Sequence, residues 1–458
     1  MPARARSWPY CSTKMADDDR RRERAVPSSR LGRLAGFGKL AGGVAGGVLS
    51  EGARRLAAGE RPRMDQLLLT PGNARRLSDQ LAHLRGAAMK LGQMISMDTG
   101  DVLPPELTAI LARLREQADF MPPRQLDTVL AEEWGKDWRR KFRRFEPRPI
   151  AAASIGQVHR AMTKDGRLLA IKVQYPGVAR SIDSDVDNVA SLLRITGLLP
   201  KGLDLDPVLA AAKEQLREEA DYHRETGMME RYAALLAGDD RYLVPTPDRE
   251  WTTRRVLAMT FEESSPIETL GDLPARERDD LFAHLIELVA RELFEFKLMQ
   301  TDPNFANYRV KRETGQLVLL DFGAARNISD EISLRYRTLL RAGLNEDREG
   351  VLDAAMAAGF VNDHAVARHP DAIRRAVDII VTQMSLRERL DFGDRSFVPQ
   401  IREEVMPIAQ DRESWHIPPP ETLFVQRKVS GTALLGARIG AAVDVRGIVN
   451  DILDRTQT

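Results

Sequence analysis

Three side chains in the second half of the sequence have the types and spacing that phosphoryl transfer requires. Asp302 is followed by four residues and then by Asn307, and Asp321 follows the short apolar run 316–320. Carboxylate and amide oxygens are ligands for Mg²⁺, which bridges the β- and γ-phosphate oxygens of a nucleotide. We therefore predict a catalytic role for Asp302, which would orient the nucleophile, and a metal-binding role for Asn307 and Asp321.

An alanine-rich segment, 151–158, has the pattern of a kinase glycine-rich loop in which two glycines are replaced by alanine. Because alanine restricts the backbone torsions that glycine allows, this loop cannot cover phosphates as freely as a glycine-rich one. The residues predicted to bind the nucleotide cofactor are Ala151, Ala152, Ala153, Ser154, Gly156, Gln157 and Val158.

Lys172 lies fourteen residues after the end of that segment, in the strand-like run LAIK. A kinase places the lysine that holds the α- and β-phosphates at this point, so we predict both a catalytic and a nucleotide-binding role for Lys172. A buried lysine also needs a carboxylate partner. The predicted helix 207–236 offers Glu218, Asp221 and Glu225 on one face. A solvated acidic face is the simpler explanation of the same spacing.

The order of these motifs, more than any single one, indicates a shared nucleotide site. A second Asp-Phe-Gly at 391–393 serves as a control: it follows a helical segment, with no strand and no upstream Asp-x-x-x-x-Asn, and we interpret it as chance. Gln300 and Thr301 precede Asp302 in place of His-Arg, and no Ala-Pro-Glu follows Asp321. The platform for a peptide substrate is therefore missing, which argues against ordinary protein-kinase activity.

Two kinds of periodicity predict the elements that position these residues. Apolar residues from Leu77 to Ile95 recur every three or four positions, as in a helix, and prolines begin two further helices near 104 and 122. From Phe142 the chain changes to short strands, with a hairpin at Asp165-Gly166. Two further short strands are predicted at 243–247 and 251–260, and after Ser265 nearly all of the chain is predicted to be helical, except for 316–320. We predict an α+β, two-lobed protein-kinase-like fold with an N-terminal helical extension.

The same pattern predicts where the parts of the chain begin and end. They are a disordered basic arm (1–33), a Gly/Ala-rich membrane-associating segment (34–59), a helical extension (60–138), a smaller lobe with the alanine-rich loop, Lys172 and the acidic helix (139–262), and a helical lobe with the catalytic and metal-binding loops (263–458).

The composition excludes several classes of protein. With 458 residues and 43% apolar side chains, the chain can bury a core and is not disordered. Its 68 basic and 67 acidic side chains nearly cancel, so no nucleic-acid partner is expected. Cys11 is the only cysteine, which excludes internal disulfides and thiolate metal cages and favours a reducing compartment.

The amino-terminal part combines basic charge with glycine. Residues 1–33 carry nine basic and four acidic side chains, as in a disordered basic arm, and Met15 is an alternative start. Residues 34–50 are rich in glycine and are interrupted by Lys39. As a helix they would span about 25 Å, less than a hydrocarbon core of roughly 30 Å. We predict a segment on or shallowly in the membrane, with a flexible linker as the alternative.

Taken together, these motifs resemble those of the UbiB-like (AarF-domain) atypical kinase family, in its branch for coenzyme Q biosynthesis. Lys90-Leu91-Gly92-Gln93 is similar to the Lys-x-Gly-Gln motif of that family, Glu219-Ala220-Asp221 to its Glu-x-Asp motif, and 151–159 to its alanine-rich loop. The segments QTDPNFAN and RLGRLAGFGKLAG also resemble this branch. The resemblance covers about residues 27–440.

The resemblance implies a lid over the nucleotide. In that family the Lys-x-Gly-Gln extension folds over the nucleotide cleft and blocks the place where a peptide would bind. Lys90 and Gln93 would then face the cleft and meet Glu219 or Asp221 as lid or regulatory residues. Lys172 would pair with Glu225, which is thereby included among the predicted catalytic residues.

The resemblance also implies cofactors, partners and a location. The cofactors would be ATP or ADP with Mg²⁺, and the activity an ATPase or small-molecule phosphotransferase reaction in ubiquinone biosynthesis. The partners would be a lipid membrane and quinone-biosynthesis enzymes or isoprenoid lipid intermediates, and a homodimer is compatible with this. The expected location is cytoplasmic, peripheral on the inner face of a bacterial cytoplasmic membrane, or on the matrix side in a mitochondrion.

Two other functions stay open. One is a non-catalytic, nucleotide-gated scaffold or lipid-extraction protein for quinone-biosynthesis enzymes. The other is a small-molecule kinase of the aminoglycoside or choline type, which shares the Asp-x-x-x-x-Asn spacing. The second explains neither the Lys90–Gln93 helix nor the alanine-rich loop.

Overall fold

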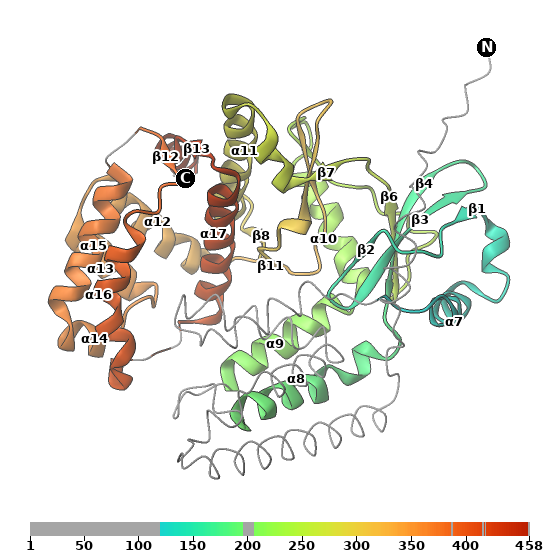
Figure 1. Ribbon diagram of the computed structural model, residues 1–458, viewed down its shortest axis with the longest axis horizontal. Coiled ribbons are helices and arrows are strands. Elements are labelled where there is room, and N and C mark those ends of the chain that lie inside the picture. Colours follow the sequence, from blue (N-terminus) through green and yellow to red (C-terminus); the bar gives the residue numbers. More distant parts are fainter. Residues whose placement is uncertain (1–119, 196–205, 386–387, 415, 417, 457–458) are drawn as a thin grey trace, which may run out of the picture. The chain divides into compact units, whose positions relative to one another are not determined.

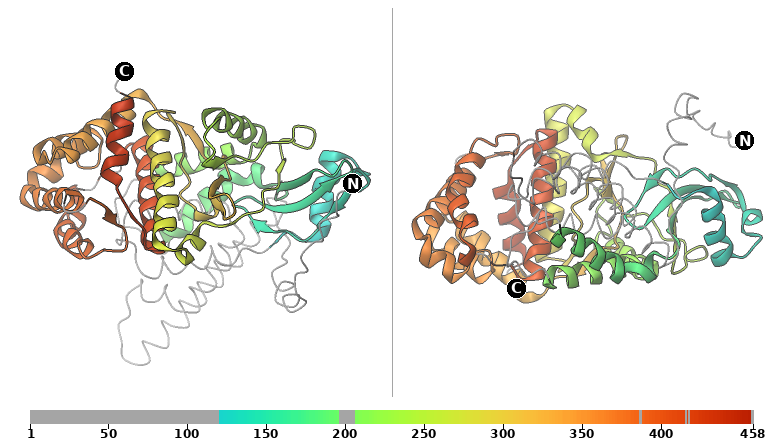
Figure 2. Two further views of the ribbon diagram at one scale, coloured as in Figure 1. Left: turned by 90° about the horizontal axis from the view of Figure 1, so that it is seen from above. Right: turned by 60° about the horizontal axis from the view of Figure 1, so that its bottom comes forward.

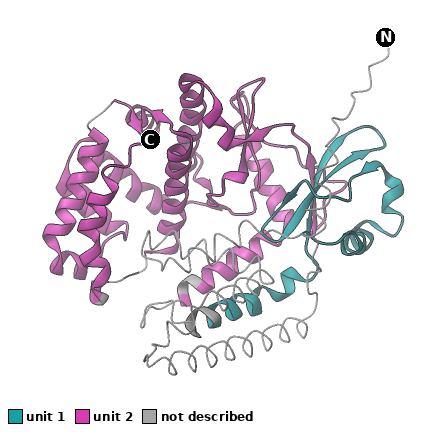
Figure 3. Cartoon of the chain, viewed as in Figure 1, with its two compact units in different colours: residues 1–92, 104–203 teal, residues 93–103, 204–458 magenta. Residues whose placement is uncertain are grey.

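The computed structural model describes residues 120–195, 206–385, 388–414, 416 and 418–456 (Figure 1). The predictions for the basic arm, the glycine-rich segment, most of the helical extension, and Lys90 and Gln93 lie outside these residues. The chain divides into two compact units (Figure 3). Unit 1 comprises residues 1–92 and 104–203, and unit 2 comprises 93–103 and 204–458.

Unit 1 contains the predicted antiparallel meander. Strand β1 pairs with β3, β3 pairs with β4, and the short β2 also pairs with β3. The turn after β3 contains Gly166, whose φ of +91° favours glycine, as the Asp-Gly signal predicts. The described elements are α7 (Pro123–Trp134), a 3₁₀ helix (Trp138–Lys141), β1 (Phe142–Phe145), β2 (Ala151–Ala152), β3 (Gly156–Thr163), β4 (Leu168–Gln174) and α8 (Val178–Ile195). The predicted helix near residue 122 is α7, whereas α8 was not predicted.

The described part of unit 2 begins with two helices where the sequence predicts one. The predicted helix 207–236 is wrong in this respect: α9 (Asp206–Glu219) ends before α10 (Tyr222–Leu235) begins. Asp221 separates them with φ −115° and ψ 95°, and its carboxylate accepts from the backbone N–H groups of His223 and Arg224. An N-terminal cap of this kind competes with helix continuation, because it satisfies backbone donors that have no partner in the first turn.

Short strands in unit 2 form three small sheets. The largest has the order β5-β10-β9-β7, with β10 parallel to β5 and antiparallel to β9. The prediction of a strand at 316–320 is confirmed by β10. The strands of these sheets are β5 (Tyr242–Leu243), β7 (Ser265–Pro266), β8 (Leu298–Gln300), β9 (Tyr308–Lys311), β10 (Gln316–Leu319), β11 (Ala325–Asn327), β12 (Leu390–Asp391) and β13 (Ala442–Val443). A further strand of this unit, β6 (Val256–Thr260), lies outside these three sheets.

Helices make up the remainder of unit 2. Helix α11 packs against α17 and α18, as both views of Figure 2 show. The helices are α11 (Ala275–Phe294), α12 (Asp330–Leu344), α13 (Arg348–Ala357), α14 (Asp363–Arg368), α15 (Pro370–Ser385), α16 (Val398–Gln410), α17 (Pro420–Ile439) and α18 (Val445–Arg455), with 3₁₀ helices at Ile267–Asp272, Phe305–Asn307 and Arg412–Ser414. Mainly antiparallel sheets, with helices in separate parts of the chain, confirm the α+β class.

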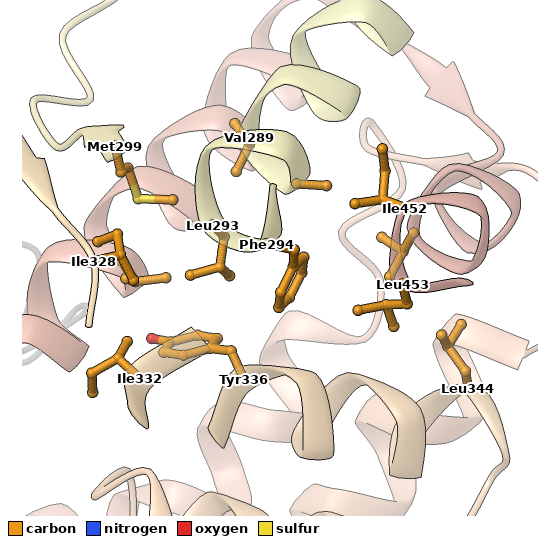
Figure 4. Packing of buried hydrophobic residues seen from close by; sticks show 13 residues of the cluster. Val289, Leu293, Phe294, Met299, Ile328, Ile332, Tyr336, Leu344, Ile452 and Leu453 are labelled. Atoms are coloured by element: carbon orange, nitrogen blue, oxygen red, sulfur yellow. The ribbon is translucent and has the colours of Figure 1, made fainter. Parts of the chain in front are cut away.

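A hydrophobic core joins helices α11, α12, α17 and α18 to strand β8 (Figure 4). Phe294 of α11, Met299 of β8, Tyr336 of α12 and Leu453 of α18 are all members of it. Burying one such side chain stabilises the fold by about 1.5–3 kcal/mol. The core therefore anchors β8, and with it the chain that leads directly to Asp302.

Candidate nucleotide and metal site

Two antiparallel strand pairs bring the predicted catalytic and metal-binding loops together in unit 2. Strand β8, which precedes Asp302, pairs with β11, which follows Asp321. Strand β9, which follows Asn307, pairs with β10, which precedes Asp321. In addition, the backbone N–H of Leu320 donates to the carbonyl of Asn307 at 2.8 Å. The two loops therefore lie opposite each other, held at both ends.

The segment between Asp302 and Asn307 is a sequence of tight turns. The Asp302 carboxylate accepts from the N–H of Asn304 at 3.3 Å, and the Asn304 side chain accepts from Ala306 N–H at 3.1 Å. Asn307 is 5% exposed, and its amide nitrogen donates to the Asp302 carbonyl at 3.4 Å. The turn chemistry of Asp-Pro-Asn thus shapes the loop and fixes the Asn307 amide beside Asp302.

Asp321 adopts a backbone conformation that few residues other than glycine accept, with φ +58°. Its carboxylate accepts from the N–H of Gly323 at 3.2 Å, and its carbonyl accepts from the side chain of Gln300 at 3.3 Å. These bonds offset the cost of the left-handed backbone, which is of order 1–3 kcal/mol. Conformations of this kind concentrate at functional sites.

Three of the predicted acidic residues meet around Gly323. A Cβ placed on Gly323 would lie 3.3 Å from Asp321 Oδ1, 3.4 Å from Glu219 Cγ and 3.4 Å from Glu225 Oε2. Glu219 ends α9 and Glu225 is in the first turn of α10, so the break between these helices allows both carboxylates to approach the same loop. Both side chains are buried, at 6% and 1% exposure.

The expectation that Glu218, Asp221 and Glu225 share one helix face is wrong, because the helix is broken between them. Asp221 caps α10, and the Glu218 carboxylate contacts Arg224 at 3.2 Å and Arg326 at 2.5 Å. Of these three residues, only Glu225 lies at the Gly323 loop. Glu219, which the spacing argument did not include, also lies there.

Arg224 is a site residue that sequence reasoning missed. Its guanidinium donates to the carbonyls of Gly323 at 2.8 Å and Ala325 at 2.7 Å, and it contacts Glu218. The planar fork of arginine suits two carbonyls at once, so Arg224 holds the Asp321 loop against α10. Its position next to Glu225 was the only signal in the sequence.

The alanine-rich loop and Lys172 occupy one sheet of unit 1. In register, Val158 of β3 lies opposite both Ala151 of β2 and Lys172 of β4. The hairpin closes where the N–H of Ala153 donates to the carbonyl of Gly156 at 2.8 Å. Ala151 and Ala152 are exposed, and Ser154 is half-buried. The predicted nucleotide-binding residues of this unit are therefore neighbours in space.

Gln157 has a different environment from the rest of the loop. Its side chain is fully buried, accepts from the N–H of Met121 at 2.7 Å and contacts the His159 ring at 3.0 Å. The whole residue is 0% exposed, so its contact with a nucleotide stays a prediction. Lys172 is 6% exposed in unit 1, while Glu225 lies in unit 2, and their pairing stays a prediction.

The oxygen ligands beside the Asp302 loop suit Mg²⁺. Within the described part of the chain, no three His, Cys, Asp or Glu side chains are grouped so that they alone could hold a metal ion. Mg²⁺ at nucleotide sites needs only one or two carboxylates, with phosphates and water completing its shell. The Asp321 carboxylate and the Asn307 amide oxygen, from loops joined by the Leu320–Asn307 hydrogen bond, fit this requirement.

The second Asp-Phe-Gly differs from its prediction in two points. Helix α15 ends at Ser385, so residues 388 and 389, which lie shortly before the motif, are not helical. A short strand, β12, does contain Asp391, and it pairs with β13. The N–H of Gly393 donates to Asp391 Oδ1 at 2.9 Å, the same side-chain hydrogen bond as in the first motif. An aspartate side chain readily accepts from an N–H two residues later, but the left-handed backbone of Asp321 is not repeated at Asp391.

Little chain is available for a peptide platform after Asp321. Helix α12 begins at Asp330, with Ser329 as its cap, so only residues 322–329 separate them. Of these, 325–327 are already paired as β11. This supports the argument from the missing Ala-Pro-Glu.

Comparisons with known proteins show which family the chain is similar to. Residues 113–355 match the ABC1 atypical kinase-like domain. The chain is similar to "Atypical kinase COQ8, mitochondrial" of Saccharomyces cerevisiae, with 37% identity over 433 residues, 93% of this chain and 85% of that protein. It is 38% identical to "Atypical kinase COQ8B, mitochondrial" of Rattus norvegicus over 439 residues, 95% of this chain and 83% of that protein.

One further relative is considerably longer than this chain, and one solved structure shares its fold. The chain is 36% identical to "Atypical kinase coq-8, mitochondrial" of Caenorhabditis elegans over 442 residues, which is 94% of this chain and 58% of that protein. The solved complex of Rv3197 with erythromycin from Mycobacterium tuberculosis aligns with a TM-score of 0.58 and 24% identity, over 83% of this chain and 95% of that one. The latter similarity shows a shared fold.

Proposed function

The chain belongs to the ABC1 atypical kinase-like family, and from this premise we propose that it binds Mg-ATP and supports ubiquinone (coenzyme Q) biosynthesis at a membrane by ATPase or small-molecule phosphotransferase activity. Membership confirms the resemblance to UbiB-like proteins of the coenzyme Q branch and the kinase-like fold. One observation carries the proposal: the paired strands that hold Asp302, Asn307 and Asp321 in facing loops.

The described residues have distinct tasks in this proposal. Asp302 orients the nucleophile, in a loop whose backbone its own carboxylate helps to shape. Asn307 and Asp321 hold Mg²⁺, which when bound neutralises charge between the β- and γ-phosphates. Lys172 and the alanine-rich loop bind ATP or ADP. Phosphoryl transfer depends mainly on positioning and electrostatics, which these fixed loops provide.

Glu219 and Glu225 supply the negative charge next to the metal-binding loop. We propose that Glu225 forms an ion pair with Lys172, as the resemblance implies. Glu219 or Asp221 would contact the lid residues Lys90 and Gln93. Asp221 already caps α10 through one carboxylate oxygen, Oδ1. Its second oxygen is 3.9 Å from Arg254, so a lid contact there would compete with that arginine.

The proposed partners are a lipid membrane and enzymes or isoprenoid intermediates of quinone biosynthesis. The names of the relatives, atypical kinases of the COQ8 group, support this pathway. Among the residues that the structure describes, no helix has the length and apolar character to cross a bilayer. We assign membrane attachment to the Gly/Ala-rich segment 34–59, as the sequence predicts.

Asp321→Asn tests the metal role against a matched control. The second motif provides the control, Asp391→Asn, because both aspartates accept from a glycine N–H two residues later. We expect Asp321→Asn to abolish thermal stabilisation by Mg-ATP and to reduce ATP turnover at least about a hundredfold, as loss of a transition-state charge contact does. Asp391→Asn should retain both. Equal turnover in the two variants would remove Asp321 from the metal role.

Asp302→Asn distinguishes a catalytic function from a nucleotide-gated scaffold function. If phosphoryl transfer or hydrolysis is the function, this variant should bind nucleotide normally and fail to restore ubiquinone in a deletion strain. A strain that recovers normal ubiquinone levels with Asp302→Asn would favour the scaffold. Quinone profiling by mass spectrometry is the measurement.

A further inference from the structure

A buried ion pair lies beneath the two loops of the candidate site. Lys428 of α17 and Glu292 of α11 are each 1% exposed, and their charged groups are 2.9 Å apart. Burial alone would lower the pKa of Lys428, but Glu292 and Tyr308 outweigh it, and the pKa of this ammonium is raised. Two charges removed from water need further hydrogen bonds to be stable, so their other partners indicate what the pair does.

Those partners lead directly to the site. The Lys428 ammonium donates to the Tyr308 hydroxyl at 2.5 Å, and Tyr308 directly follows Asn307. The Tyr308 hydroxyl donates to the side-chain oxygen of Gln300 at 3.2 Å. The side-chain nitrogen of Gln300 donates to the carbonyl of Asp321 at 3.3 Å. A continuous chain of hydrogen bonds therefore runs from Lys428 to the metal-binding loop.

Glu292 also bonds to Gln300, the third residue of this hydrogen-bonded chain. Its second carboxylate oxygen accepts from the Tyr232 hydroxyl at 3.0 Å and from the backbone N–H of Gln300 at 3.4 Å. Tyr232 in turn packs on the ring of Phe322, with centroids 4.8 Å apart. Both the main chain and the side chain of Gln300 are thus fixed, two positions before Asp302.

The ammonium of Lys428 gives this chain a direction. It is a donor only, so the Tyr308 oxygen must accept from it, and the Tyr308 proton is directed to another acceptor. That acceptor is the carboxamide oxygen of Gln300, which leaves the NH₂ group of Gln300 to face the Asp321 carbonyl. With Gln300 rotated by 180°, two oxygens would face each other and the Asp321 carbonyl would lose its donor.

We propose that Lys428 and Glu292 are positioning residues: through Tyr308 and Gln300 they hold the Asp321 loop in the left-handed conformation that presents its carboxylate to Mg²⁺. This inference rests on the metal role of Asp321 given above. The left-handed backbone at Asp321 is otherwise unfavourable, and the Gln300 bond to its carbonyl is a fixed restraint on that peptide. Groups that orient metal ligands in this way tune metal affinity without touching the metal.

Tyr308→Phe tests the proposal, because it removes only the hydroxyl and leaves the ion pair in place. We expect faster hydrogen exchange of the amides in 320–325, and an Mg²⁺ concentration for half-maximal ADP binding that is about tenfold higher than in the parent. ADP binding without metal should be unchanged. Calorimetry and hydrogen exchange by mass spectrometry measure these quantities.

The matched control is Tyr336→Phe. Tyr308 and Tyr336 are each 6% exposed, and Tyr336 also donates one hydrogen bond, to the Thr422 carbonyl at 3.0 Å, away from the chain described above. A second test, Lys428→Met with Glu292→Gln, removes both charges together and leaves none unpaired. It should change exchange and Mg²⁺ requirement in the same direction as Tyr308→Phe.

Equal exchange in 320–325 and equal Mg²⁺ requirement in Tyr308→Phe and Tyr336→Phe would overturn the proposal. The exchange experiment needs no nucleotide, so it decides the positioning role even if the parent protein binds none. Failure of the parent to bind Mg-ADP would instead contradict the proposed function.

Discussion

Gly431 of α17 lies so close to Pro303 that a side chain at Gly431 has no room. A Cβ at this glycine would overlap the Cβ of Pro303 and lie 3.3 Å from its Cα. Pro303 directly follows Asp302, and Gly431 is three residues from Lys428, on the same side of the helix. Helix α17 therefore contacts the Asp302 loop directly at Gly431, and through Lys428 it contacts Tyr308, the residue that follows the loop.

Gly431→Ala should displace the Asp302 loop. Alanine improves helix propensity by about 1 kcal/mol, but the overlap with a proline ring and its backbone costs about 1–3 kcal/mol. We expect lower thermal stability than in the parent and loss of most ATP turnover. Gly227→Ala in α10 is the control, since nothing lies within 4 Å of a Cβ there. It should be neutral or stabilising, and a Gly431→Ala protein that matches it would show that the loop tolerates the shift.

Arg224→Lys should loosen the Asp321 loop from α10. Lysine keeps the charge but cannot donate to the Gly323 and Ala325 carbonyls as a planar fork. We expect a loss of about 2 kcal/mol of unfolding free energy in urea and weaker Mg-ATP binding. Arg231→Lys on the same helix is the control, because Arg231 donates to the exposed Asn327 side chain. Equal losses in the two variants would argue against a specific clamp.

Local signals in the sequence predicted the elements with short-range causes. The hairpin at Gly166 follows from a two-residue turn signal, and β10 from a short apolar run that ends at Asp321. The facing arrangement of Asp302, Asn307 and Asp321 could be inferred from motif order alone. The strands that enforce it, β8 and β11, have three residues each and give no periodic pattern.

The remainder depends on contacts between distant parts of the sequence. The helix break at Asp221 was missed because a capping aspartate and a helical aspartate look alike until the neighbouring backbone is known. Arg224 binds carbonyls that follow it by about a hundred residues, and Lys428 binds the Tyr308 hydroxyl, which lies 120 positions before it. Burial and the identity of a partner are properties of the folded chain.

His159 should make the stability of unit 1 depend on pH. Its ring is fully buried, Nδ1 lies 2.9 Å from the Glu146 carbonyl, and Nε2 lies 3.0 Å from the Gln157 amide nitrogen. Burial lowers the pKa of His159 to about 4, despite the opposing effect of the Glu146 carbonyl. The folded form therefore keeps a neutral ring, with Nδ1–H donating and Nε2 accepting.

The sign of the effect follows from where protons bind. Between pH 6.5 and about 4 the unfolded chain protonates this histidine while the folded chain does not, so the unfolding free energy falls as the pH falls, by about 3 kcal/mol in all. Urea unfolding across this range should show a flatter pH dependence for His159→Gln than for the parent. His223→Gln, at an exposed histidine, is the control and should keep the parent's slope. A parent-like slope in His159→Gln would mean that another group causes the acid sensitivity.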